Sequence, residues 1–371
     1  MPVINYEPIN TATDTTTTRT LLHESIPVTG TIASGTYKEG GGGSDFFGSN
    51  IKNYSHGMFQ SVYDYPYLSS SANHIYDLTV GYDEGSTLSG AASIQNAKKI
   101  NLYNQFAQVL LGYTGSTFNV EIFEGDLNVG DNNNQMKEVF FVNFSRLLTK
   151  DQIKKGTFTI DVGTGSWALP WGATTANGKF WPAGPNIRLQ DMSASNTQGT
   201  KNTLGGDYGV LYRSGTIGAD NPYGVVFYQA GIAILTASVF AGIADFYSGS
   251  GLEAVGQRSV DVMLTGNDVS SSCDGFRHRL NNLSFNNVTE INSTIYFCRI
   301  PFNKYNYSAN PSYTSGSKIR VKSVASDSPV SYVTTVGLYN SANELLAVAK
   351  VSEPLKKTPS NELTLRVRLD Y

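Results

Sequence analysis

The residue types that could carry chemistry are few in this chain, and they do not form catalytic patterns. The four histidines are His23, His56, His74 and His278, and none has the spacing of paired metal ligands or of a helical zinc motif. The Gly-x-Ser-x-Gly motif of a nucleophilic serine does not occur in the sequence. We therefore expect no catalytic residue, no metal site and no cofactor, and we expect that the protein is not an enzyme.

Two glycine-containing segments have some features of phosphate-binding loops but lack the required spacing. Five residues separate Gly172 from Gly178-Lys179, where a Walker A loop has four, and Phe180 stands where a hydroxyl must contact magnesium. In residues 39–44 the glycines are contiguous, and two phenylalanines follow closely. Neither segment predicts a phosphate site, and we expect 39–44 to be a flexible loop.

The segment 121–134 is rich in side-chain oxygens. Asp126 and Asn128 occupy the first and third positions of a calcium-loop pattern. Gly130 stands at the fifth position, however, and Lys137 replaces the glutamate that should bind the ion with both oxygens. The segment is better explained as an ordinary turn between strands.

All three tryptophans fall in one Gly- and Pro-rich stretch, residues 163–185, and they are Trp167, Trp171 and Trp181. Such a stretch can be a long loop folded onto its own aromatic rings. It can also be a docking surface for another protein, since exposed Trp side chains anchor interfaces, or a platform on which sugar rings stack. These three residues are the candidate interaction site, and the docking and sugar-stacking alternatives both stay open.

The composition restricts the elements that must position these residues. Charged residues make up 15% of the chain, well below the roughly 25% of an ordinary soluble domain, while the chain contains 37 Gly, 22 Tyr and 18 Phe. This composition favours strands and turns and excludes a helical bundle. The net charge of −3, without a long basic run, argues against direct binding of nucleic acid. Two cysteines, Cys273 and Cys298, are too few for a disulfide scaffold.

Two segments have the pattern of helices. Apolar residues recur at three-to-four spacing near 93–111, with Ser93 as N-cap and Gly112 as the residue that ends the helix. The polar side of this amphipathic helix, which includes Lys99, is expected to face water. A short helix is expected near 149–156, with Thr149 as its cap.

Most other segments have strand patterns, which predicts a mainly β (α+β) fold of antiparallel β-sandwich or sheet domains. The expected strands are 25–32, 138–142, 157–162, 209–212, 225–228, 259–264, 293–300 and 362–371, with a hairpin formed by 332–338 and 344–351. Residues 221–244 carry no charge and could be taken for a membrane span. Their β-branched and aromatic content favours two buried strands joined at 229–231, so we expect no membrane span.

We expect three parts along the chain. Residues 1–20 are polar and Thr-rich, and they predict an extended N-terminal arm that is ordered only by a partner outside the domain. Residues 21–200 predict a β-rich domain with the packed helix and the Trp-containing loop, and residues 201–371 predict a β-sandwich-like domain. The N-terminus lacks the basic and apolar regions of a signal peptide.

Several segments resemble virion structural proteins of large contractile-tailed phages, notably those that infect cyanobacteria. The resemblance covers roughly residues 140–371, and it is carried by 143–156, 223–235, 295–299, 304–311, 332–340, 343–350 and 365–371. It implies a subunit of the tail baseplate or neck that is made in the host cytoplasm and located in the virion. The implied partners are other virion structural proteins and further copies in a homo-oligomer. It supplies no functional residue.

Two alternatives belong to the same class of particle. The chain could be a receptor- or glycan-binding module of a phage fibre, using the three tryptophans, or a capsid-associated decoration protein. The polar arm, the Gly-rich loops and the low charge also fit a subunit that works by contact, because weakly charged surfaces associate without strong repulsion.

Overall fold

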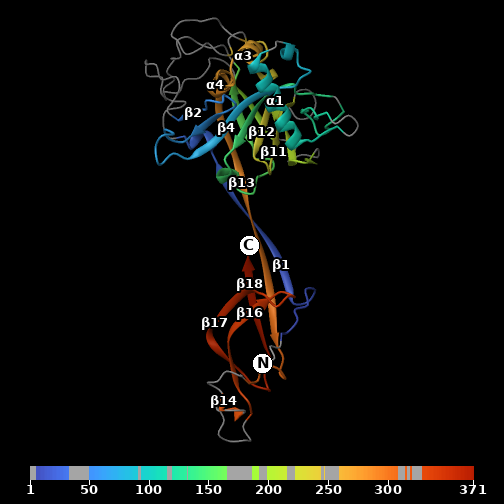
Figure 1. The fold of residues 1–371 in the computed structure, drawn as a ribbon, viewed down its shortest axis with the longest axis vertical. Coiled ribbons are helices and arrows are strands. Elements are labelled where there is room, and N and C mark those ends of the chain that lie inside the picture. The colour runs from blue at the N-terminus through green and yellow to red at the C-terminus, as the bar shows by residue number, and fades with distance from the viewer. Residues whose placement is uncertain are drawn as a thin grey trace. The chain divides into compact units, whose positions relative to one another are not determined.

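The computed structural model describes residues 6–32, 50–90, 93–114, 119–131, 133–164, 186–191, 199–214, 222–243, 246, 259–307, 314–315, 318–319 and 328–371. The chain divides into two compact units (Figure 1). Unit 1 comprises Met1–Leu21 and Glu290–Tyr371, and unit 2 comprises Leu22–Thr289. The expected boundary between residues 200 and 201 falls inside unit 2, because the strands on its two sides, β8 (Asn186–Asp191) and β9 (Lys201–Thr203), both pair with β10 (Gly206–Arg213).

Unit 2 is built on one large antiparallel sheet. The order across it is β13-β7-β8-β10-β11-β12-β5-β4-β3-β2, and the short strands β6 and β9 pair with β13 and β10. The bounds are β2 (Ile51–Asn53), β3 (Gln60–Tyr63), β4 (His74–Tyr82), β5 (Glu138–Phe144), β6 (Gln152–Ile153), β7 (Thr159–Gly163), β8 (Asn186–Asp191), β9 (Lys201–Thr203), β10 (Gly206–Arg213), β11 (Pro222–Phe227), β12 (Ile232–Thr236) and β13 (Leu280–Ile300). The mainly β prediction is therefore confirmed.

The two faces of this sheet carry separate cores, because successive residues of a strand point to opposite faces. In β5, Phe141 belongs to one core, and Phe140 and Val142 belong to the other. The first core is covered mainly by α1 (Ile94–Leu110), and the second by α3 (Val260–Gly266) and α4 (Val269–Arg279). Unit 2 thus has helices on both faces of a single sheet.

Helix α1 is the element that sequence periodicity located best. The Ser93 side chain accepts a hydrogen bond from the Asn96 N–H at 3.1 Å, and Gly112, with φ +100°, follows its end. The prediction for its polar side is wrong at one position, because Lys99 is fully buried.

The expected short helix near 149–156 is wrong in position. The helix there is α2 (Arg146–Thr149), and Lys150 follows with φ +55°, which stops it. The next residues form β6, in which the fully buried Ile153 pairs with Asn287 of β13. These residues pair with β13 instead of continuing the helix.

Two predicted strands are also corrected. Residues 260–264 lie in α3, and Ser259 caps its start by accepting the Val262 N–H at 3.5 Å. The strand expected at 25–32 ends at Ile26, and a 3-10 turn, Val28–Gly30, follows Pro27. The other 3-10 turns are Thr87–Gly90 and Ala237–Phe240.

The uncharged stretch 221–244 forms two buried strands, as expected. β11 and β12 pair antiparallel, with Val225 opposite Ile234, and both residues are at most 1% exposed. In the part of the chain that the structure describes, no helix combines the length and the apolar character needed to cross a bilayer.

Unit 1 contains strands and no described helix. β13 pairs antiparallel with β18 (Leu363–Asp370), and its other neighbour is β1 (Thr15–Ile26). β16 (Ser331–Tyr339) and β17 (Leu345–Lys357) form the predicted hairpin, and β14 (Thr314–Ser315) pairs with β15 (Lys318–Ile319). β1 and β13 contain residues of both units.

The described part of the N-terminal arm, residues 6–20, contacts other segments of this chain, which corrects the expectation that only an outside partner orders it. Residues 15–20 belong to β1 beside β13. The Asp14 carbonyl accepts the Phe297 N–H at 2.8 Å, and the Asp14 carboxylate pairs with Arg299 at 2.8 Å. Arg19 forms an ion pair with Glu290.

Candidate functional site

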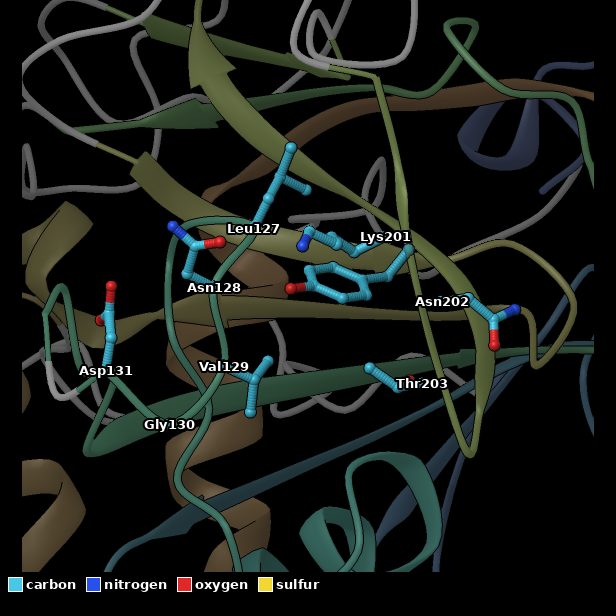
Figure 2. Close-up of a pocket in the computed structure, with 9 residues that line it drawn as sticks. Leu127, Asn128, Val129, Gly130, Asp131, Lys201, Asn202 and Thr203 are labelled. Atoms are coloured by element: carbon cyan, nitrogen blue, oxygen red, sulfur yellow. The ribbon is translucent and has the colours of Figure 1, made fainter.

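A pocket of about 400 Å³ lies in unit 2 between a loop and a strand (Figure 2). Residues 127–131 line one side, and β9 with Tyr208 of β10 lines the other. Tyr208 is 1% exposed, and its hydroxyl donates to the Asp126 carbonyl at 3.3 Å. Burial, together with the charges of Asp126 and Glu124, raises the pKa of Tyr208 above its usual range, so this phenol stays protonated.

The lining residues offer polar groups of several kinds. Asp131 supplies a carboxylate, Lys201 an ammonium group, and Asn128 and Asn202 supply amides. The pocket could orient a small polar ligand by hydrogen bonds.

Three carboxylates lie close together beside this pocket. Glu124, Asp126 and Asp131 each offer an oxygen, and these oxygens lie within 4.8 Å of one another. Such oxygens are the ligands that a hard cation such as Ca²⁺ takes. They also accept backbone N–H groups of the loop, since Asp126 accepts from Asn128 at 2.8 Å and Glu124 accepts from Gly130 at 3.0 Å. These hydrogen bonds hold the loop closed, which fits the predicted turn.

The sequence pattern found only part of this cluster. The pattern contains Asp126 and Asn128, but Asn128 has an amide and no carboxylate, and Glu124 precedes the first position of the pattern. Glu124 reaches the cluster because it forms an isolated antiparallel bridge with Gln135, which closes the loop. A linear ligand pattern does not contain that pairing.

The other sequence candidates divide into residues outside the described ranges and histidines with local contacts. Trp167, Trp171 and Trp181 lie outside the described residues, so the interaction site predicted there stays a prediction. His74 contacts Asp77 at 2.8 Å, and His56 stacks on Tyr54 with ring centroids 5.1 Å apart.

The two cysteines are free thiols. Cys273 of α4 is fully buried, and its thiol donates to the Leu78 carbonyl at 3.4 Å. Burial raises the pKa of Cys273 well above its usual value, so the reactive thiolate is disfavoured. Burial also raises the pKa of the half-buried Cys298.

A buried lysine connects the helices of unit 2. The Nζ of Lys99 donates to the carbonyls of Leu264 and Asn267, the latter at 2.7 Å, at the end of α3. Terminal helix carbonyls lack intrahelical donors and carry partial negative charge, so the ammonium satisfies them. Burial nevertheless lowers the pKa of Lys99 to about 8, with Cys273 and Asp268 acting in the opposite direction.

This lowered pKa predicts that stability rises with pH in alkaline solution. Below pH 8 Lys99 is protonated in the folded and the unfolded chain, whereas between about 8 and 10.5 the unfolded chain binds more protons. The free energy of unfolding should therefore increase by roughly 2 kcal/mol between about pH 7.5 and 9.5. Urea denaturation at the two pH values measures this difference in the free energy of unfolding. The Lys99→Met variant should lack the increase. An equal increase in the variant would contradict the assignment.

Unit 1 exposes apolar side chains and buries almost none. Among its described apolar residues only Leu338 and Val367 are buried, at 8% and 7% exposure, whereas unit 2 contains every member of the two core clusters. Twelve large apolar side chains of unit 1 are exposed: Tyr6, Ile9, Leu21, Phe302, Tyr305, Tyr307, Tyr332, Tyr339, Leu345, Leu346, Val348 and Tyr371. This apolar surface is the second candidate functional site, and its chemistry is that of a protein contact.

Compared with known proteins, the chain matches no family model, no curated protein and no solved structure.

Proposed function

We propose that this chain is a structural subunit of a tailed-phage virion, of the tail baseplate or neck, that works through protein contacts and not as an enzyme. In this proposal it is made in the host cytoplasm, it resides in the particle, and its partners are other virion proteins and further copies of itself. It does not bind nucleic acid directly.

The observation that carries the proposal is the apolar surface of unit 1. A β-sheet unit normally buries at least one apolar face against another layer, because that burial offsets the entropy lost on folding. Unit 1 buries only two of its described apolar residues. Its apolar residues therefore suit a subunit that completes its core by contact with neighbours.

Two further features support an assembly role. The chain has few charges for its size, so that copies and neighbours meet with little electrostatic repulsion. The segments that resemble tailed-phage virion proteins include 332–340, 343–350 and 365–371, which contain most of β16 and β18 and part of β17. The same strands therefore carry both the resemblance and much of the apolar surface.

The proposal predicts that the protein is a stoichiometric component of purified particles. Particles of the phage that encodes this chain would be purified on a density gradient, washed in high salt and analysed by quantitative mass spectrometry. We expect peptides of this chain at a fixed ratio to the other tail proteins. Their loss in the salt wash, or their absence from infectious particles, would overturn the proposal.

A further inference from the structure

We infer that the β16–β17 hairpin is the self-association surface of this protein, and that its occupant is the same hairpin of a second copy of the chain. The inference rests on the proposed assembly role, and it assigns a surface and a partner to that role.

Four apolar side chains make up the surface, here called the hairpin face: Tyr6, Tyr339, Leu345 and Val348. Tyr339 lies directly opposite Leu345 in the hairpin, and Gly337 lies opposite Val348. Directly opposed residues share a face of the sheet. A Cβ on Gly337 would contact the Tyr339 ring and the Leu345 side chain, which places them together. The Tyr6 ring meets the Tyr339 ring edge-on, with centroids 5.0 Å apart.

These side chains are open to solvent. The exposed fractions are 41% for Tyr6, 45% for Tyr339, 52% for Leu345 and 54% for Val348. The residues on the opposite side of the hairpin, such as Val336 and Ala349, are half-buried, and Leu338 is buried. The hairpin is therefore covered on one side and uncovered on the other.

The exposed apolar area of the hairpin face suits a modest, reversible contact. At about 150–250 Å² for a large side chain, the hairpin face exposes roughly 350 Å². Each partner of a stable complex buries about 800 Å², so the hairpin face supplies part of that area, and we expect association to depend on protein concentration.

The charge pattern favours a second copy as the occupant. Between Ser331 and Ala349 the only charged residue is Glu344. Its carboxylate accepts the Asn340 side-chain N–H at 2.7 Å, which fixes the turn of the hairpin. The four side chains of the hairpin face carry no charge, so they neither select an oppositely charged partner nor repel an identical surface.

The residues at the strand edges also favour a second copy as the occupant. In the described part of the chain β16 and β17 form a two-stranded sheet, so each presents one edge. β17 carries Pro354, Lys350 and Lys356, which are devices that discourage edge pairing, whereas β16 has no proline and no charge. Among the described residues no strand other than β17 pairs with β16, so its second edge suits pairing with the same strand of another copy.

The test uses the purified full chain in solution. We expect sedimentation equilibrium to show a concentration-dependent homo-oligomer. Leu345→Asp should weaken association by at least about 100-fold, because an unpaired carboxylate would be buried in the contact. Leu68→Asp is the matched control, since Leu68 is an exposed leucine in unit 2, at 86%, and should leave association unchanged. A monomeric wild type, or an unaffected Leu345→Asp variant, would overturn the inference.

A cross-linking measurement tests the same contact independently, because Leu345→Asp could also disrupt the folding of the hairpin. In a Cys298→Ser background, Leu345→Cys should form a disulfide between two chains under a mild oxidant, and Leu68→Cys should not. Equal cross-linking of both variants would overturn the inference. A monomeric chain that is nevertheless found in particles would refute self-association and leave the proposed function standing. An oligomer that is absent from particles would refute the proposed function instead.

Discussion

Replacing Arg277 by alanine is expected to lower the free energy of unfolding by about 3–5 kcal/mol. Arg277 of α4 is 0% exposed and donates to the Asp274 carboxylate at 3.0 Å, and the side chain of Asp274 is 4% exposed. The same carboxylate oxygen also accepts the Gln60 side-chain N–H at 2.7 Å. Without Arg277, the Asp274 carboxylate would lose this cationic partner in the interior. Chemical denaturation at neutral pH measures the loss.

Arg188→Ala is the matched control for this prediction. Arg188 also pairs with an aspartate, Asp161, at 2.7 Å, but its side chain is 54% exposed. Water replaces the lost partner at such a site, so the cost should stay below about 1 kcal/mol. Similar losses in Arg188→Ala and Arg277→Ala would show that burial does not set the difference.

Replacing Arg279 by methionine is expected to cost about 2–6 kcal/mol, because two buried carbonyls would lose their donors at about 1–3 kcal/mol each. Arg279 is 0% exposed, and it donates to the carbonyls of Phe246 at 2.9 Å and Gly163 at 2.8 Å. Its guanidinium also lies over the Phe246 ring, 5.4 Å from the centroid. Methionine fills a similar volume and removes the donors, so thermal and urea unfolding would report mainly the lost hydrogen bonds.

Arg146→Met is the matched control for Arg279→Met, because it removes similar hydrogen bonds at an exposed position. Arg146 likewise donates to two backbone carbonyls, those of Gln229 at 2.7 Å and Asp151 at 3.4 Å, but it is exposed. Water can reach the two carbonyls once the donors are gone, so we expect a loss of less than about 1 kcal/mol. A loss in Arg146→Met that equals the loss in Arg279→Met would contradict the role given to burial.

The parts of the fold that were predictable are those whose signal is local. The C-terminal strand, β18, alternates apolar and polar residues over its whole length, and α1 has a cap, a three-to-four period and a terminating glycine. The strand predicted at 259–264 shows where a local sequence pattern gives the wrong secondary structure. Ser259-Val260-Asp261-Val262 alternates like a strand, but six residues do not distinguish a period of 2 from one of 3.6. The Ser259 cap and the burial of Met263 stabilise a helix in this segment.

The buried cations were not predictable, because their partners are distant in sequence. Lys99 contacts carbonyls 165 and 168 positions away, and Arg279 contacts one 116 positions away. The sequence does not show which backbone carbonyls will lie near a given side chain, and a lysine without a visible partner is expected to face water. The carboxylates beside the pocket were missed in part for the same reason, since a bridge to Gln135 brings Glu124 to Asp126.

The uneven distribution of the core has a consequence for timing. Nearly all of the heat-capacity change on unfolding, which scales with apolar surface, should come from unit 2. Unit 2 can therefore mature on its own, whereas unit 1, under the proposed assembly role, would gain much of its stability only when a neighbour covers its apolar side chains. Under that proposal the subunit would join a growing structure in a set order, because unit 1 would stay weak until its neighbour is in place.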